Sequence, residues 1–327
     1  MNASRPIQER MKVMQAKPLD VKRRTHDTSL RHDLAMNKGL YLLAIPIIAF
    51  FLIFNYAPMA GLVIAFQDFK PQRGILGSNW VGVKNFVDFF TNPSFWTILR
   101  NTLVISLLGL VIAFPMSIVF ALQLNEINWK PFKKTIQTVS YMPYFISLVV
   151  ICGLVTEFCA SNGVVTSIFC AITGKPRENL LTNPNYFWTI NLLSDLWQNL
   201  GYSSIIFVAA ITSVSAELHE AAAIDGATRL RRVWSITIPS IMPTIVTMLI
   251  LRCGSLLSVG FEKILLLYNP STYSTADVIS THVQRLGIEK AQYGYSTAVG
   301  LFNSVINTAL LITANHFSRK FTDTSVL

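Results

Sequence analysis

Six long apolar stretches constrain this chain more than any other feature of its sequence. They cover about 40–66, 102–124, 135–156, 187–211, 241–261 and 297–317. A helix needs about 20 mainly apolar residues to cross the hydrocarbon layer of a bilayer. Charged residues make up only 13% of the 327 residues and hydrophobic residues 52%, which leaves too little charge to cover a water-soluble domain. We therefore predict an all-α integral membrane protein with about six transmembrane helices.

The distribution of basic residues predicts how these spans are oriented. With a cytoplasmic N-terminus, 17 of the 27 Lys and Arg residues lie in cytoplasmic segments and nine in outer segments. Because basic residues favour the cytoplasmic side, we expect both termini in the cytoplasm. We predict a basic cytoplasmic tail over 1–39, which is either solvated or lies as a helix on anionic membrane lipid, a membrane domain over 40–318 and a cytoplasmic tail over 319–327. Charge placed in this way indicates no nucleic-acid partner.

Two outer segments leave alternatives open. Apolar residues from Trp80 to Phe90 predict a short amphipathic helix, which either lies on the membrane surface or packs against the spans. In the next outer segment, Cys159 and Cys170 are either free or joined by a disulfide.

The loop between the fourth and fifth spans has the most informative sequence. It covers 217–239 and predicts a short helix, a turn at Gly226 and a second helix. Ala221 and Ala222 favour the first helix, whereas glycine tolerates the backbone of a turn. Pro239 lies near the start of the fifth span, and proline is tolerated in the first turn of a helix.

This loop resembles the signature loop of bacterial ABC importer permeases. That pattern is Glu-Ala-Ala, three residues, Gly, nine residues, Ile, one residue and Leu-Pro. The corresponding residues here are Glu220, Ala221, Ala222, Gly226, Ile236, Ile238 and Pro239. Ile238 replaces Leu and is the one departure. Stretches such as TVSYMPYFIS extend the resemblance over about 38–327, to the permeases that carry oligo- and polysaccharides.

The resemblance implies a type I ABC importer permease fold in the bacterial cytoplasmic membrane. It implies a heterodimer with a second permease chain, two copies of a cytoplasmic ABC ATPase and an extracytoplasmic solute-binding protein. The residues implied to dock on the ATPase are Glu220, Ala221, Ala222, Asp225, Gly226, Arg229 and Pro239. The resemblance also implies that ATP and Mg bind to that ATPase, and consistently this chain has no phosphate-binding loop motif. The implied substrate is a saccharide, and acidic, alginate-like polysaccharides are included.

Polar residues within two spans indicate where a substrate passes, because polar groups in a membrane face a cavity or another helix. The residues that the resemblance places on this path are Asp195, Gln198, Asn199 and Tyr202 on one face of the fourth span, and Arg252 and Ser255 in the fifth. Counted from the expected span ends, Asp195 and Arg252 both lie about 15 Å deep. Arg252 therefore either contacts an anionic group such as a uronate or forms an ion pair with Asp195.

Other functional classes explain the sequence less well. An ion-gradient-driven transporter predicts midplane acidic residues and broken helices in repeated halves, and this chain has only Asp195 and no repeat. A non-transporting membrane scaffold leaves the loop over 217–239 unexplained. The sequence has neither a nucleophile–base motif nor metal-ligand spacing, so we expect a non-enzymatic subunit without a metal of its own.

Overall fold

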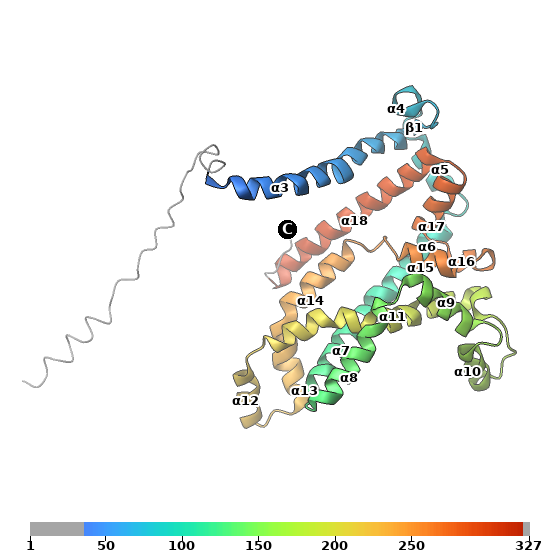
Figure 1. Ribbon diagram of the computed structural model, residues 1–327. Coiled ribbons are helices and arrows are strands. Elements are labelled where there is room, and N and C mark those ends of the chain that lie inside the picture. Colours follow the sequence, from blue (N-terminus) through green and yellow to red (C-terminus); the bar gives the residue numbers. More distant parts are fainter. Residues whose placement is uncertain (1–35, 323–327) are drawn as a thin grey trace, which may run out of the picture. The chain divides into compact units, whose positions relative to one another are not determined.

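The computed structural model describes residues 36–322 (Figure 1). The chain divides into two compact units, Met1–Ala60 and Gly61–Leu327. Most of the predicted tail over 1–39, and residues 323–327 of the predicted C-terminal tail, lie outside the described residues.

The described part of the first unit belongs to a single apolar helical stretch. Helix α3 covers Lys38–Phe51 and continues through a π-helical turn, Leu52–Tyr56, into a 3-10 helix over Ala57–Phe66. The mean hydropathy reaches 2.2 within Lys38–Phe66. Pro46 lies inside α3, where its ring removes one backbone hydrogen bond. This stretch agrees with the first predicted span.

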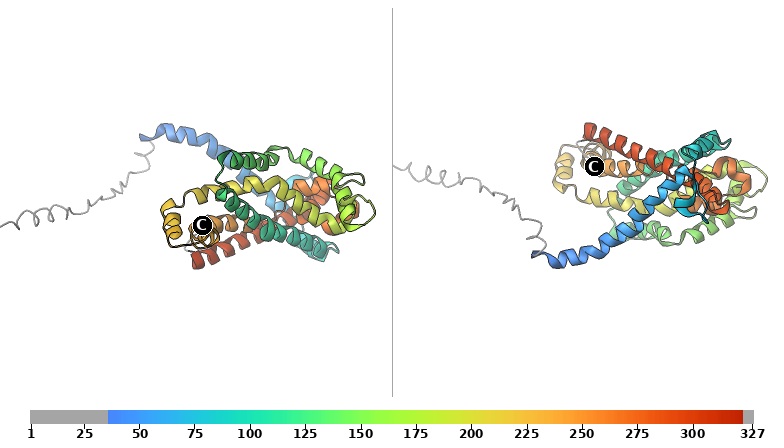
Figure 2. Two further views of the ribbon diagram at one scale, coloured as in Figure 1. Left: turned by 90° about the horizontal axis from the view of Figure 1, so that it is seen from below. Right: turned by 90° about the horizontal axis from the view of Figure 1, so that it is seen from above.

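The second unit is almost entirely helical. Its α-helices are α4 Gly74–Gly77, α5 Lys84–Thr91, α6 Phe95–Leu108, α7 Phe114–Glu126, α8 Lys130–Tyr141, α9 Leu148–Cys159, α10 Val164–Thr173, α11 Pro184–Thr212, α12 Ala216–Ile224, α13 Arg229–Arg232, α14 Ile238–Cys253, α15 Phe261–Leu267, α16 Tyr273–Ala276, α17 Ile279–Gln284 and α18 Tyr293–Thr322. A small antiparallel hairpin, β1 Gln67–Asp68 and β2 Asn79–Trp80, pairs Gln67 with Trp80. Figures 1 and 2 show α11 crossing this unit alongside α7.

Five stretches of the described residues are long and apolar enough to cross a membrane, and a bent helix pair makes a sixth. The five are Lys38–Phe66, Phe95–Glu126, Leu148–Thr173, Arg229–Cys253 and Tyr293–Arg319. The sixth combines α11 with α12, which are bent by 70°. The predicted all-α membrane protein with about six spans is therefore confirmed, whereas two of the predicted spans have wrong boundaries.

The third predicted span, 135–156, contains a helix break. Helix α8 ends at Tyr141, and a 3-10 turn over Met142–Phe145 follows. Pro143 lacks the backbone N–H that would continue the α-helix. Ser147 then starts α9 as a cap, because its side chain accepts a hydrogen bond from the backbone N–H of Val150. The membrane-spanning stretch accordingly begins at Leu148 and not near Thr135.

The fifth span both begins and ends earlier than the predicted 241–261. Helix α13 continues through a π-helical turn, Val233–Thr237, into α14, which ends at Cys253. Pro239 lies in the first turn of α14, as predicted. Residues 254–260 are not helical. Arg252 therefore lies in the last turn of its helix, and the depth counted from a helix end at Phe261 was wrong.

Three apolar clusters hold the second unit together. Phe114, Phe207 and Ile241 join α7, α11 and α14. A cluster around Phe187 joins α6, α9, α11 and α15. A third cluster around Phe89 joins α5, α6, α17 and α18. Since Phe89 lies on α5, the predicted amphipathic helix packs against the other helices.

Two local features complete the fold. Gly201 brings α11 close to α8, since a Cβ atom at this position would lie 2.2 Å from the carbonyl oxygen of Ser140. The chain's four cysteines are all free, so Cys159 and Cys170 are not joined.

Candidate substrate path and coupling segment

The segment 217–239, here called the coupling segment, folds as a helix, a turn and a second helix. Ser215 caps α12 by accepting a hydrogen bond from the backbone N–H of Glu217. After α12, Gly226 adopts a φ of 77°, a left-handed backbone that costs other residues about 1–2 kcal/mol. Thr228 caps α13 by accepting from the backbone N–H of Arg231. The predicted helix–turn–helix is thus confirmed.

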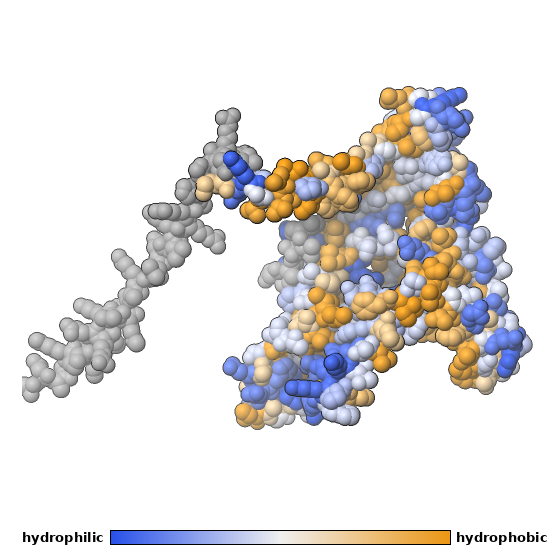
Figure 3. Space-filling view, viewed as in Figure 1, coloured by the Kyte–Doolittle hydropathy of each residue, from blue (hydrophilic) through white to orange (hydrophobic). Residues whose placement is uncertain are grey.

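The surface of the coupling segment combines exposed apolar and charged side chains. Ile224, Leu230 and Trp234 are 87%, 74% and 69% exposed. Of the predicted docking residues, Ala222 is half-buried and the others are exposed. The exposed ones are Glu220, Ala221, Asp225, Gly226, Arg229 and Pro239. Figure 3 shows hydrophilic residues over α12 and α13 with apolar residues among them. Exposed apolar groups rimmed by charge are typical of a protein contact surface.

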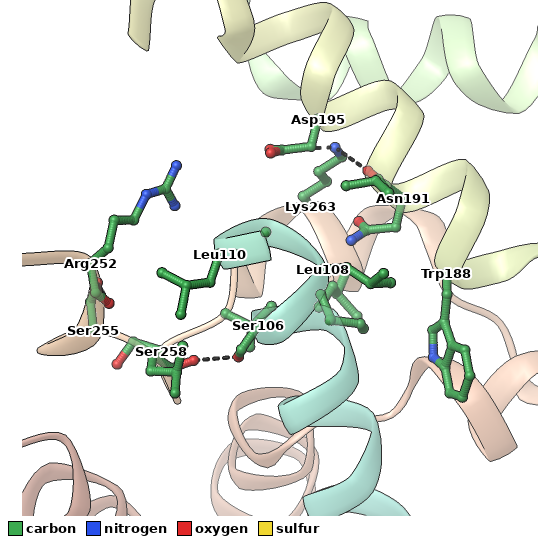
Figure 4. A pocket seen from close by; sticks show the side chains of 17 residues that line it. Ser106, Leu108, Leu110, Trp188, Asn191, Asp195, Arg252, Ser255, Ser258 and Lys263 are labelled. Carbon is green, nitrogen blue, oxygen red and sulfur yellow. Dashed lines mark hydrogen bonds and ion pairs between the residues drawn. The ribbon is translucent and has the colours of Figure 1, made fainter. Parts of the chain in front are cut away.

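Two adjoining cavities contain most of the predicted path residues. The smaller, of about 140 Å³, is enclosed by residues of α6, α11 and α15 and by the end of α14 (Figure 4). The larger, of about 650 Å³, lies among α7, α11 and α14. Arg252 and Ser255 line both cavities, so these two residues mark where the cavities meet.

The remaining path residues divide between cavity walls and support. Asp195 lines the smaller cavity and Tyr202 the larger one. Asn199 lines neither, but its side-chain amide donates a 2.7 Å hydrogen bond to Asp195 Oδ1. Gln198 is buried and lines neither cavity. The helix face predicted from the spacing of these four residues thus contains two wall residues, one supporting amide and one buried amide.

Lys263 is a charged residue of this site that sequence reasoning missed. Its Nζ lies 3.8 Å from Asp195 Oδ1 and donates a 3.1 Å hydrogen bond to the carbonyl oxygen of Asn191. Lys263 is only 7% exposed. The available signal was the apolar run that starts directly after it, at Ile264. Because it follows the predicted fifth span, Lys263 was counted as an outer-loop cation.

Arg252 differs from Lys263 in both exposure and pairing. Its side chain is exposed, and no carboxylate among residues 36–322 lies within 4.0 Å of it. Of the two predicted roles of Arg252, the ion pair with Asp195 is therefore not formed. Figure 4 shows the Arg252 guanidinium and the Asp195 carboxylate projecting toward the same open space.

Comparison with known proteins places the chain in a family. Residues 113–323 match the family described as binding-protein-dependent transport system inner membrane component. The chain belongs to this family. It is accordingly a multi-pass component of a bacterial inner-membrane transport system, and the predicted alternatives, a gradient-driven transporter and a scaffold, are not favoured.

Two curated relatives align with this chain over most of its length. The polygalacturonan/rhamnogalacturonan transport system permease protein YteP of Bacillus subtilis (strain 168) is 43% identical over 288 residues, covering 88% of this chain and 90% of that protein. Protein LplB of the same organism is 42% identical over 289 residues, covering 88% of this chain and 91% of that protein.

Two solved structures of permeases share the fold. One belongs to a bacterial ABC transporter involved in the import of the acidic polysaccharide alginate; it is 43% identical, with a TM-score of 0.83 over 90% of this chain and 99% of that chain. The other is an alginate ABC transporter in complex with an alginate pentasaccharide-bound periplasmic protein, with 43% identity and a TM-score of 0.84 over 91% and 99% of the two chains. The predicted ABC importer permease fold is confirmed.

Proposed function

We propose that this chain is the permease subunit of an ATP-driven importer of oligo- or polysaccharides that carry carboxylates. The observation that carries the proposal is the likeness over nine-tenths of the chain to a transporter of an acidic polysaccharide. Arg252 supports the proposal, because it is exposed at the junction of two cavities, has no carboxylate partner among residues 36–322, and carries a guanidinium that matches a carboxylate with two parallel hydrogen bonds.

The saccharide passes along the two cavities between α11 and α14. Arg252 binds a carboxylate, Tyr202 offers an aromatic face to a sugar ring, and Ser255 bonds to sugar hydroxyls. Asp195 forms part of the wall of the path, and Gln198 and Asn199 support it from the same helix. The hydroxyl and aromatic groups suit any saccharide, so Arg252 is the residue that favours acidic ones.

The coupling segment docks on a cytoplasmic ABC ATPase. This chain pairs with a second, similar permease chain. Two ATPase copies bind the pair on its cytoplasmic side, and a solute-binding protein delivers the saccharide from the extracytoplasmic side. ATP and Mg bind to the ATPase, whose closure moves the coupling segments and alternately opens the path to either side. The exposed Ile224, Leu230 and Trp234 support docking, because such apolar side chains gain most when a partner covers them.

A pull-down tests the partners. The tagged chain is purified in mild detergent from its native cell, as wild type and as Glu220→Arg, and co-purifying proteins are identified by mass spectrometry. We expect wild type to retain an ABC ATPase and a second permease, and Glu220→Arg to lose the ATPase. Glu289→Arg, a charge reversal at another exposed position, is the matched control and keeps both partners. A chain that purifies alone in every form contradicts the proposed complex.

An uptake assay tests the class of substrate. Arg252→Gln removes the cation but keeps hydrogen-bonding capacity. Loss of a charged hydrogen bond of about 1.5–3 kcal/mol is expected to lower uptake of an acidic oligosaccharide about tenfold or more. Uptake of a neutral oligosaccharide of equal length falls less. Equal losses for both probes contradict an acidic substrate and leave the importer assignment intact.

A further inference from the structure

Three charged side chains line the smaller cavity, and their charges do not cancel. Asp195 is negative, whereas Lys263 and Arg252 are positive (Figure 4). Lys263 and Asp195 form an ion pair, with Asp195 held further by Asn199. The cavity therefore contains one neutralised carboxylate and one cation with no carboxylate partner among the described residues.

We propose that Lys263 is a positioning residue that determines specificity: by neutralising Asp195, it keeps Arg252 free to bind the carboxylate of a substrate. This inference rests on the proposed function and adds a residue to it. Arg252 and Asp195 lie on the wall of one cavity of about 140 Å³, so an uncompensated Asp195 attracts the Arg252 guanidinium. Such an internal pair would occupy the group that recognises the substrate.

Burial and hydrogen bonding distinguish the roles of the two cations. Lys263 is 7% exposed, and its ammonium is already occupied by the Asn191 carbonyl and the Asp195 carboxylate. A compact ammonium with these two partners suits a fixed internal counter-charge. Arg252 is exposed at the end of α14 and lines both cavities. In this proposal Lys263 neutralises Asp195, whereas Arg252 contacts the substrate.

The test is a double-mutant cycle in cells that carry the complete importer. Lys263→Met, Asp195→Asn and the double variant are each introduced into the full chain, with Lys263→Arg as the control that keeps the charge. The probes are labelled tetragalacturonate and its methyl ester, which have the same sugar skeleton but differ in charge. Uptake of each probe is divided by the amount of the chain in the membrane.

We expect Lys263→Met to lower uptake of the acid about tenfold and uptake of the ester much less. Adding Asp195→Asn to this variant is expected to recover most of the acid uptake, because no carboxylate then remains to capture Arg252. Uptake of the acid is expected to fall less in Lys263→Arg than in Lys263→Met. A merely structural role predicts that uptake of the acid and of the ester fall and recover together, because Lys263→Met leaves an unpaired charge on Asp195 whichever probe is used.

Each other outcome overturns either this inference or the proposed function. An acid uptake that stays as low in the double variant as in Lys263→Met, or equal losses for acid and ester, overturns the role of Lys263. If Lys263→Met does not accumulate in the membrane, the double variant decides: retained preference for the acid supports the inference, and lost preference overturns it. Wild-type cells that import neither probe contradict the proposed substrate class instead.

Discussion

The rings of Tyr144 and Tyr202 stack with centroids 3.6 Å apart and planes 2° from parallel. Tyr144 comes from the 3-10 turn that interrupts the third predicted span, and Tyr202 comes from α11. Tyr202 also lines the larger cavity. The turn that contains Pro143 thus places the Tyr144 ring against Tyr202, in the wall of the larger cavity.

Tyr144→Ala removes this supporting ring and leaves Tyr202 in place. An aromatic pair contributes about 0.5–1.5 kcal/mol beyond its buried area, so we expect KM for oligosaccharide uptake to rise about 2–10-fold. Tyr144→Phe keeps the stacked ring and is expected to change KM less. An uptake assay over a range of substrate concentrations measures both, and equal KM values for Tyr144→Ala and wild type would show that the stack does not orient Tyr202.

Gly201→Ala is expected to destabilise the packing of α11 on α8. Its Cβ atom would lie 2.2 Å from the Ser140 carbonyl oxygen, so the two helices must move apart. Overpacking of this kind costs about 1–3 kcal/mol. Gly153→Ala is the matched control, because the position is helical and has no atom within 4 Å. Thermal unfolding in detergent should show a lower midpoint for Gly201→Ala only.

Gly226→Ala is expected to weaken the turn of the coupling segment. A residue with a Cβ atom pays about 1–2 kcal/mol to adopt the φ of 77° found here. We expect less ATPase to co-purify with this variant, whereas the amount of the chain in the membrane stays near wild type. Gly300→Ala, in α18 and with open space around it, serves as control. Undiminished ATPase binding by Gly226→Ala would mean that the turn conformation is not needed for docking.

His282 is expected to make the stability of the folded protein depend on pH. Burial lowers the pKa of His282 from its usual 6.5, against the opposing effect of Asp277 and with a further lowering by Arg285 and Lys290. Its Nε2 lies 3.2 Å from the Tyr295 hydroxyl. Well above pH 6.5, the His282 imidazole is unprotonated in both the folded and the unfolded protein. As pH falls through 6.5 the unfolded state binds the proton first, so stability falls by at most about 1.4 kcal/mol per pH unit.

The measurement is the unfolding midpoint at pH 7.5 and at pH 5.5. His282→Gln is expected to reduce the difference between these midpoints. His316→Gln, at an exposed position of α18, should retain the wild-type difference. The assignment to His282 is wrong if both variants behave like wild type.

Hydrophobic length predicted the number of spans but not their interruptions. Residues 254–260 are apolar enough to extend the fifth predicted span, yet Gly254 and Gly260 bracket a segment that is not helical. Hydropathy measures compatibility with lipid, whereas the end of a helix depends on local backbone preferences.

The helix–turn–helix of the coupling segment was predictable because the signals that form it are local. Gly226 and Thr228 act on residues within a few positions of themselves. The pair formed by Lys263 and Asp195 joins residues 68 positions apart, so no local pattern indicates it. The same holds for Tyr144 and Tyr202, which meet where the 3-10 turn after α8 packs on α11.

Helix α11 contains both Asp195 and Tyr202 and is followed after three residues by α12. About 26 Å of uninterrupted helix separates Asp195 from Thr212, at 1.5 Å per residue. Because α11 is uninterrupted over this distance, we expect a displacement of its C-terminal end, which adjoins α12, to tilt the helix as a unit and so to move the Asp195 carboxylate. One helix therefore connects the wall of the smaller cavity with α12, and we expect substrate bound in that cavity to oppose or favour movement of α12.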